Sequence, residues 1–561
     1  MAETVQLSTL RRTLRRTFGF RALREGQEEV IRSILAGRDT LAIMPTGAGK
    51  SLCYQLPGAE LPGTTVIVSP LISLMKDQVD KLRELGVDAA QVNSTLNRSE
   101  ESEVLEQIGK EQREFVFVTP ERLAQPEFLE TLKANLIDIF VIDEAHCISH
   151  WGHDFRPSYL HLRAAIEALG NPRVLALTAT ATPAVVDDIR HQLGREGMEV
   201  IDIGVYRENL RFEVMPTPRE DAKRETLARL LAEAEGTGIV YVSTIKDCEE
   251  VTEHLESLGF DAARYHGRLG ARERKRTQER FMAGELRVIV ATNAFGMGID
   301  KPDIRFVVHY NLPGSLESYY QEAGRAGRDG EPARCILFYQ QEDRNTQIFF
   351  LNGRYPKREH FLAVYQALGK LRADRHEVAV GEVQKRAAGV AQAKVKVVLA
   401  TMKDLEMVAE PSPGQYQLLA DGLGGEELDA MADRYEKRSE GDRDRLRRMM
   451  LYAQTALCRW KAILDYFGED FDWERCGHCD NCSRPIRELA EPPRAEVPVR
   501  PPHGTSESLP MPPIIGGRDP GTLQPGDLVT LSIFGAGEVR SVDPHNVIIE
   551  LGGGEVREFR R

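Results

Sequence analysis

Short apolar runs that alternate with polar loops and helix-like stretches set the strongest limit on how this chain can fold. The first series of runs covers residues 40–44, 64–68, 115–118, 137–142 and 174–177. A second series begins near Arg211 and covers residues 238–241, 261–265, 288–291 and 306–310. Runs of this kind with helices between them indicate parallel sheets that are covered on both faces. We therefore predict an α/β protein with two such sheets.

Two carboxylates, Asp143 and Glu144, follow the run at residues 137–142. In open α/β sheets, ligands bind beyond the carboxyl ends of the strands. One carboxylate at such a place can hold a magnesium ion, and the next can orient an attacking water. The alternative is a surface acidic pair beside a packing loop, and the residues that follow argue against it.

An aromatic and basic loop comes a few residues after this acidic pair. It contains Trp151, His153, Phe155 and Arg156. This composition is too polar for a core loop and too aromatic for an ordinary solvent-exposed loop. Such loops stack unpaired bases and hold phosphates. We therefore predict that these four residues contact nucleic acid, close to the acidic pair.

A glycine-rich turn, PTGAGKS, lies between the run at residues 40–44 and a helix-like stretch. Backbone amides in such a turn cradle phosphates. Lys50 is expected to reach the β- and γ-phosphates, and Ser51 to bind magnesium together with Asp143. Met44 replaces the first glycine of the strict pattern. The nucleotide-binding residues that we predict in this turn are Thr46, Gly47, Ala48, Gly49, Lys50 and Ser51.

The cysteines fall into two groups. Four scattered ones are expected to be reduced packing residues, namely Cys53, Cys147, Cys248 and Cys335. The clustered ones have a spacing that suits a closed tetrahedral zinc site: Cys458, Cys476, Cys479 and Cys482. His478 competes as a ligand, although so tight a loop favours four sulfurs. A disulfide is the alternative, and a cytoplasmic chain disfavours it.

The net charge of −13 shows that the chain is not basic as a whole, so any nucleic-acid surface must be a local patch. No apolar run is long enough to span a bilayer, and the N-terminal residues lack the apolar segment of a signal peptide. We expect a cytoplasmic protein, in the bacterial cytoplasm or nucleoid, without a membrane partner.

The second half of the chain has a different pattern. Helix-like stretches at residues 359–371 and 380–388 precede a third one, and a turn between two short strands follows; together these features suggest a winged helix. The apolar face of the third helix consists of Val395, Val398, Leu399, Met402 and Leu405. Three lysines lie off that face and either meet DNA phosphates or form a solvated surface: Lys394, Lys396 and Lys403.

Helical periodicity resumes over residues 427–467, with apolar positions that include Leu446, Leu457 and Trp460. A Pro-rich stretch after Cys482 reads as an extended linker. Short β runs with glycine turns close the sequence and predict a small β-barrel.

Several long motifs resemble those of superfamily 2 helicases: PTGAGKS, SPLISLMKDQV, TPERL, DEAH and TATAT. Others are similar to the RecQ family of DNA helicases: AHCISHWGHDFRPSY, YHGRL, VATNAFGMGIDKPDIRFVVH and SYYQEAGRAGRDG. The resemblance covers residues 8–345 and the clustered cysteines. It implies two RecA-like domains with ATP in the cleft between them, a zinc module, and 3′ to 5′ unwinding of DNA in repair and recombination.

The same resemblance implies roles for single residues. Arg24 and Gln27 match the motif that reads adenine. Arg328 matches the arginine finger, with Arg325 as a γ-phosphate ligand and Gln321 nearby. An arginine at the γ-phosphate offsets charge in the transition state of phosphoryl transfer. Trp151, Phe155 and Arg156 match the loop that couples single strands to hydrolysis.

The predicted order of domains departs from the RecQ pattern, because the winged-helix-like segment precedes the zinc module. We divide the chain into a first RecA-like domain (1–207), a second (208–353), a winged-helix-like domain (354–422), a zinc-binding helical hairpin (423–486), a linker (487–521) and a barrel (522–561). The barrel resembles the Tudor-like tail of UvrD-type helicases, which implies a protein partner there.

Together these observations predict a monomeric ATP-dependent DNA helicase that uses ATP, Mg²⁺ and Zn²⁺ and binds single-stranded and forked DNA. Two alternatives remain at this point. One is an RNA helicase, because superfamily 2 RNA helicases share the DEAH motif. The other is an ATP-driven protein that binds or remodels nucleic acid without processive unwinding.

Overall fold

The computed structural model describes residues 7–93, 104–108, 114–149, 151, 152, 154–296, 299–372, 377–405, 407–412, 414–419, 425–483, 509–511, 514, 519–531, 535–551 and 556–560. The chain divides into two compact units, residues 1–489 and 490–561. Each unit has its own core and is described by itself. None of the described helices is long and apolar enough to cross a membrane.

The first sheet of the large unit has seven parallel strands in the order β3-β4-β2-β5-β6-β1-β7. The strands are β1 (Thr40–Ile43), β2 (Thr64–Val68), β3 (Ala89–Val92), β4 (Phe115–Val118), β5 (Ile137–Ile142), β6 (Arg173–Thr178) and β7 (Glu199–Asp202). The helices around it are α1 (Leu7–Arg16), α2 (Gln27–Leu35), α3 (Leu52–Gly58), α4 (Ile72–Glu84), α6 (Pro120–Leu123), α7 (Pro126–Lys133), α8 (Leu162–Ala168) and α9 (Pro183–Leu193).

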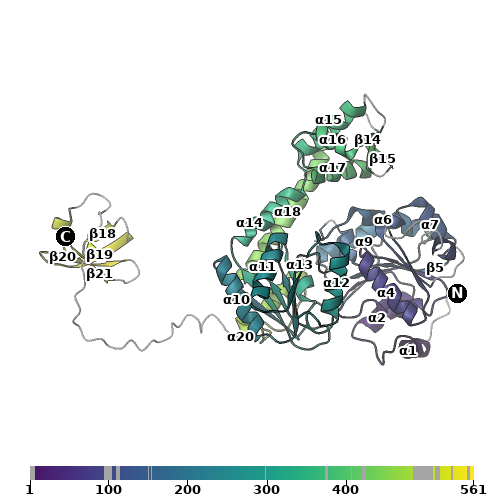
Figure 1. Cartoon of the computed structure of the whole chain (residues 1–561), viewed down its shortest axis with the longest axis horizontal. Coiled ribbons are helices and arrows are strands. Elements are labelled where there is room, and N and C mark those ends of the chain that lie inside the picture. Colours follow the sequence, from purple (N-terminus) through teal and green to yellow (C-terminus); the bar gives the residue numbers. More distant parts are fainter. Residues whose placement is uncertain are drawn as a thin grey trace. The chain divides into compact units, whose positions relative to one another are not determined.

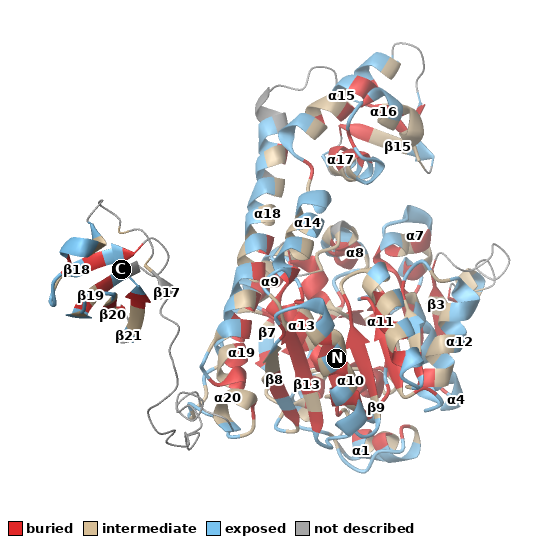
Figure 2. Ribbon diagram, turned by 60° about the vertical axis from the view of Figure 1, so that its left-hand side comes forward, coloured by how far each residue is buried: buried red, intermediate tan, exposed pale blue. Residues whose placement is uncertain are grey.

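Both faces of this sheet are buried, which explains its continuous apolar strands. Leu41 and Ile43 belong to one core cluster, whereas Ala42 between them belongs to another. Figure 2 shows the strands of the large unit as mostly buried beneath more exposed helices.

The second sheet has six parallel strands in the order β10-β11-β9-β12-β13-β8. The strands are β8 (Leu210–Pro216), β9 (Thr237–Tyr241), β10 (Ala262–Tyr265), β11 (Val288–Ala291), β12 (Ile304–His309) and β13 (Ala333–Tyr339). Helices α10 (Glu220–Glu233), α11 (Ile245–Ser257), α12 (Ala271–Met282) and α13 (Leu316–Ala323) follow its strands, and α14 (Asp343–Arg354) leads out of it (Figure 1). The prediction of two parallel sheets is confirmed.

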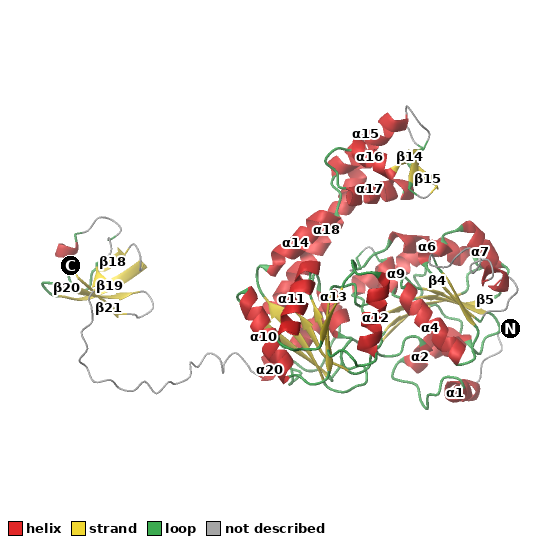
Figure 3. Ribbon diagram, in the orientation of Figure 1, coloured by secondary structure: helices red, strands yellow, loops and turns green. Residues whose placement is uncertain are grey.

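A small three-helix segment comes next, with its own antiparallel sheet in the order β14-β16-β15 (Figure 3). Its elements are α15 (Arg358–Arg372), β14 (Val378–Ala379), α16 (Val380–Arg386), α17 (Gln392–Asp404), β15 (Val408–Ser412) and β16 (Gln415–Leu418). Val395, Val398, Leu399 and Met402 are buried in its core, as predicted. Leu405 was wrongly placed on that face: it is 37% exposed because α17 ends one residue earlier.

The helix pair predicted after this segment consists of α18 (Gly425–Gln454), which has 30 residues, and α19 (Arg459–Phe467). A short helix, α20 (Asp480–Ser483), lies among the last cysteines. Leu457 was expected to continue the apolar period, but it lies in the turn between α18 and α19 and is 63% exposed. Trp460, by contrast, is fully buried against the second sheet, and its indole Nε1 donates to the carbonyl of Leu210 at 3.0 Å.

The second unit is a five-stranded sheet in the order β17-β21-β20-β19-β18. Its strands are β17 (Leu509–Pro510), β18 (Leu528–Leu531), β19 (Gly535–Val542), β20 (Asn546–Leu551) and β21 (Val556–Arg560). Alternate residues such as Val539, Ile549 and Phe559 form its core. An isolated bridge between Ile514 and Leu531 links the two ends of the sheet, in keeping with the predicted barrel. Most of the predicted linker, residues 487–521, lies outside the described residues.

Candidate active site

The glycine-rich turn connects β1 to α3. Gly47 and Gly49 have φ angles of 91° and 82°, values that residues with a side chain rarely adopt. A Cβ on Gly49 would also lie 2.5 Å from Nε2 of Gln27. Lys50 is anchored at this turn, since its Nζ donates to the carbonyl of Met44 at 3.1 Å. The turn thus has the backbone that a phosphate cradle requires.

Arg24 and Gln27 contact the glycine-rich turn directly. The Nε2 of Gln27 donates to the carbonyls of Ala48 and Gly49, both at 3.0 Å. Its Oε1 accepts the backbone N–H of Arg24 at 2.8 Å, and the Arg24 guanidinium donates to the carbonyl of Gly47. Both predicted adenine-reading residues therefore adjoin the turn, and their contact with a base stays a prediction.

The acidic pair lies at the carboxyl end of β5, beside the turn. Asp143 accepts from the Ser69 hydroxyl at 3.2 Å and from the backbone N–H of Glu144 at 3.0 Å. Burial, followed by the charge of Glu144, raises the pKa of Asp143 to about 7, against the opposing charge of Lys50. Burial likewise lowers the pKa of Lys50, and the two carboxylates oppose that shift. A half-buried carboxylate beside a serine hydroxyl suits a hard cation with oxygen ligands, so the site fits Mg²⁺.

Glu144 has a φ of 51°, one of two positive values among the described non-glycine residues. Its carboxylate lies 3.4 Å from Nδ1 of His146. That Nδ1 also lies 3.0 Å from the hydroxyl of Thr178, which donates to the carbonyl of Thr180 at 3.0 Å. His146 therefore connects the acidic pair to the end of β6, a role that the DEAH and TATAT motifs alone did not reveal.

The arginines predicted in the second domain occupy different places. Arg328 lies against the glycine-rich turn, since a Cβ on Gly47 would be 3.3 Å from its Cγ. Its guanidinium pairs with Asp300 at 2.8 Å, and burial lowers its pKa. Arg325 is buried and donates to the carbonyl of Gly296. Gln321 is half-buried on α13. Of the three, Arg328 is the one in contact with the turn.

Arg207, which the sequence did not single out, links the two domains at the same place. Its Nη1 donates to the carbonyl of Gly324 at 2.8 Å and reaches that of Thr46 at 3.5 Å. Its Nη2 donates to the carbonyl of Ala326 at 2.9 Å and to that of Gly327. One side chain thus contacts both the glycine-rich turn and the segment that carries Arg328.

The clustered cysteines form the predicted group of four sulfurs, all within 4.8 Å of one another. Backbone N–H groups of Cys476, Cys479 and Arg459 donate to sulfurs at 3.3–3.4 Å, which favours thiolates. Zn–S bonds of about 2.3 Å suit such a group, so the residues fit a zinc ion. His478 lies outside it, with its Nδ1 at 2.9 Å from the carbonyl of Cys476. Cys458 falls within residues 427–467, which were predicted as helical, but it lies in the turn between α18 and α19, directly before α19.

The four scattered cysteines are buried in the cores, as predicted.

The aromatic loop is fastened to the acidic site. The hydroxyl of Tyr159 donates to the carbonyl of Asp143 at 3.2 Å. Arg156 pairs with Asp154 at 3.1 Å and reaches the carbonyl of Pro70 at 3.4 Å. Trp151 is 52% exposed, as a base-stacking residue would be. His153 lies outside the described residues.

Helix α18 holds the other side of this loop. The guanidinium of Arg438 lies 3.9 Å from the ring centroid of Phe155. Arg445 donates to the backbone carbonyl of Trp151 at 2.9 Å and pairs with Asp442. Asp442 also accepts from Tyr355, at the start of the three-helix segment. The loop is therefore held between the acidic site and helix α18.

Comparisons with known proteins agree with this arrangement. Residues 24–189 match the DEAD/DEAH box helicase family, residues 222–330 the helicase conserved C-terminal domain, and residues 423–483 the RecQ zinc-binding domain. The chain is similar to ATP-dependent DNA helicase RecQ of Bacillus subtilis, with 46% identity over 63% of this chain and 59% of that protein.

The probable ATP-dependent DNA helicase RecS of the same bacterium is 38% identical over 480 residues, 84% of this chain and 92% of that protein. Among solved structures, the DUF1998 helicase MrfA bound to DNA has a TM-score of 0.52 at 18% identity, covering 75% of this chain and 64% of that one. At that identity, the likeness concerns the fold alone.

Proposed function

This chain belongs to the RecQ family of superfamily 2 helicases, and from that premise we propose that it is an ATP-dependent DNA helicase. It moves 3′ to 5′ on single-stranded DNA and separates duplexes in repair or recombination. The observation that carries the proposal is the contact between Arg328 of the second domain and Gly47 of the first. A nucleotide on the glycine-rich turn would meet this arginine, so that hydrolysis depends on how the two domains meet.

The residues of the site divide the chemistry among them. Lys50 binds the β- and γ-phosphates, and Ser51 and Asp143 hold Mg²⁺. The bound ion offsets phosphate charge. Glu144 orients the attacking water, and the imidazole of His146 lies 3.4 Å from its carboxylate. Arg328 then offsets the charge that develops in the transition state.

The aromatic loop couples the binding of single-stranded DNA to ATP hydrolysis at this site. A base stacks on the exposed ring of Trp151, with Phe155 and Arg156 nearby. Tyr159 and Arg156 join the loop to the carbonyls of Asp143 and Pro70. A shift of the loop on DNA binding would therefore reach the magnesium ligand through one hydrogen bond.

The remaining domains have supporting roles. The four cysteines hold a structural zinc, and the three-helix segment approaches duplex DNA at a fork. Of the three predicted lysines, Lys394 donates to the Asn352 carbonyl and Lys403 to Glu410, and both Lys396 and Lys403 are exposed. The second unit binds a protein partner, and the helicase acts as a monomer.

Strand displacement on tailed duplexes tests the proposal. We expect ATP-dependent unwinding of a DNA duplex with a 3′ tail and little unwinding of one with a 5′ tail. The matched control is Lys50→Ala, which should bind single strands without hydrolysing ATP. ATP hydrolysis without strand displacement would favour a remodelling protein, and preference for an RNA duplex would favour an RNA helicase.

A further inference from the structure

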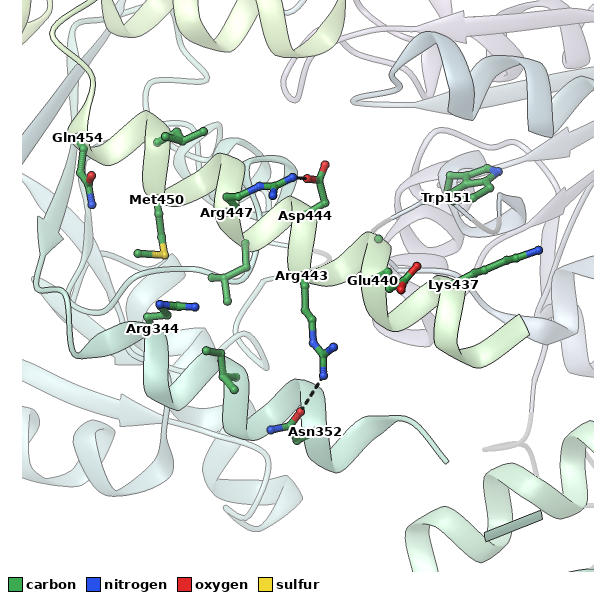
Figure 4. A pocket seen from close by; sticks show the side chains of 14 residues that line it. Trp151, Arg344, Asn352, Lys437, Glu440, Arg443, Asp444, Arg447, Met450 and Gln454 are labelled. Carbon is green, nitrogen blue, oxygen red and sulfur yellow. Dashed lines mark hydrogen bonds and ion pairs between the residues drawn. The ribbon is translucent and has the colours of Figure 1, made fainter. Parts of the chain in front are cut away.

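A groove between α14 and α18 adjoins the aromatic loop but belongs to no site described above. Its volume is about 1020 Å³. Residues of both helices line it, and Trp151 stands at its edge near Lys437 (Figure 4). The half-exposed ring of Trp151 thus faces a space shaped by two helices outside the first domain.

The groove carries an excess of positive charge. Arginine and lysine side chains outnumber acidic ones, with Arg344, Lys437, Arg443 and Arg447 against Glu440 and Asp444. Asp444 is already paired with Arg447, and Arg443 donates to Asn352 at 3.3 Å. Within the described part of the chain, the side chains of Arg344 and Lys437 take part in no hydrogen bond or ion pair. On a chain with net charge −13, such a local excess indicates an anionic ligand.

The floor of the groove is apolar. Ile348 of α14 and Met450 of α18 line it and pack against the core cluster that contains Leu446, and Leu451, which also lines it, is 61% exposed. A free phosphate or an acidic peptide would gain little from this floor. A ligand with a charged backbone and flat apolar groups would use both the floor and the cationic side chains, and single-stranded nucleic acid has that chemistry.

The position of Trp151 determines which part of such a strand lies here. Arg445 holds the tryptophan backbone at 2.9 Å from α18, the same helix that forms one wall of the groove. A base stacked on the ring therefore has the groove as its neighbour. Cavities of about 300–1,000 Å³ hold small-molecule-sized ligands. The volume accordingly suits a few unpaired nucleotides rather than a duplex.

We propose that the groove between α14 and α18 binds the sugar–phosphate backbone of single-stranded DNA next to the base stacked on Trp151, an inference that rests on the proposed function. Arg344 and Lys437 contact the phosphates, and bases lie against the apolar floor. Helix α18, which leads into the cysteine cluster, thereby becomes part of the single-strand path as well as a support for the aromatic loop.

The test is equilibrium binding of a fluorescent oligothymidine at several salt concentrations by the full chain. The variant is Arg344→Ala/Lys437→Ala. The control is Arg32→Ala/Lys275→Ala, which removes the same charge from side chains 54% and 72% exposed on α2 and α12. We expect the groove variant to bind about tenfold more weakly at low salt. Its plot of log Kd against log salt should be shallower by about 1.4, because each lost phosphate contact removes about 0.7 from the slope. The control should match the wild type.

Melting temperatures near the wild-type value establish that both variants are folded. If the wild type binds oligothymidine and the folded groove variant binds it with the same affinity and salt slope, the groove does not bind single-stranded DNA. The helicase proposal would be unaffected by that result. Loss of affinity for a blunt duplex but not for oligothymidine would also overturn it. A wild type that binds no oligothymidine would contradict the proposed function itself.

Discussion

At the scale of single residues, Arg207 joins segments that lie far apart in the sequence. Its guanidinium contacts the carbonyls of Gly324, Ala326 and Gly327, just before Arg328. Residues of the zinc module hold the two residues that precede Arg207. The carboxylate of Glu469 accepts the N–H of Val205 at 2.6 Å, and the ring of Trp460 packs on that of Tyr206 with centroids 4.9 Å apart. We infer that Arg207 positions the arginine finger against the glycine-rich turn.

Replacing Arg207 by Met should therefore lower ATP turnover while leaving the KM for ATP near the wild-type value. Lys50 and the glycine-rich turn remain, but the segment of Arg328 loses its support. A displacement of about 1 Å can cost on the order of a hundredfold in rate. Steady-state ATPase assays with saturating single-stranded DNA would measure this effect.

Arg211→Met is the matched control, because Arg211 lies four residues on and only pairs with Glu213 at 3.4 Å. Arg207→Lys should give an intermediate rate, since one ammonium group cannot reach all the carbonyls. Wild-type turnover in a folded Arg207→Met protein would contradict a positioning role.

The residues of the nucleotide site were predictable because their signals are local. The turn at residues 45–51 and the pair Asp143–Glu144 each follow a buried strand, so their place at the sheet edge follows from the strand alone. Arg207, Arg438 and Arg445 were not predicted, since each acts on a segment that only the packed fold brings near. No spacing in the sequence connects Arg438 with Phe155, nearly three hundred residues away.

At the scale of elements, the zinc module connects the second sheet to the aromatic loop. Trp460 of α19 is fully buried in the core of the second domain, and α18 reaches Trp151 through Arg445. The four sulfurs fix the loop between α19 and α20. The module therefore contacts both the second domain and the aromatic loop, the two parts that the proposed coupling involves.

Cys479→Ser should reduce zinc content from one ion per chain and lower soluble yield. Structural zinc contributes on the order of 10 kcal/mol to small domains. His478→Ala is the control in the same loop and should keep its zinc, because His478 lies outside the sulfur group. Metal analysis of purified proteins decides the matter: equal zinc loss in both variants would mean that the histidine is a ligand.

Among the strands of the two parallel sheets, those with continuous apolar runs were predicted and four were missed. One of the four is β8 (LRFEVMP), an edge strand of the second sheet, for which no run was predicted. β3 (AAQV) and β7 (EVID) are edge strands of the first sheet, and their partly polar sequences resemble loops. β13 (ARCILFY) lies inside the second sheet, and its apolar run is of the kind that predicts a buried strand, so the miss has no structural reason. Edge strands are harder to predict because one side has no neighbouring strand, which relaxes the demand for apolar residues.

At the scale of the whole molecule, residues 490–561 form a separate unit with a core of their own. The residues of the nucleotide site, the zinc site and the groove all belong to the first unit. We therefore predict that the second unit has no part in the motor.

A chain that ends at Gly504 should keep its DNA-stimulated ATPase and its melting temperature for the large unit. The deleted part contains a complete sheet, so its removal exposes no core of the remaining protein. ATPase assays with and without oligothymidine on the truncated and full chains would test this. A folded truncation without DNA stimulation would place the second unit in the motor.

The central claim is that the aromatic loop couples single-stranded DNA to ATP hydrolysis, and Trp151→Ala tests it most directly. ATPase rates with and without oligothymidine, measured with the melting temperature on one preparation, give the answer. We predict a basal rate and a melting temperature near the wild-type values, because Lys50, Asp143 and Glu144 are untouched and Trp151 is half-exposed. Stimulation by DNA should fall by roughly tenfold to a hundredfold, since one base-stacking aromatic contributes about 1–3 kcal/mol. Full stimulation in the variant would contradict the account.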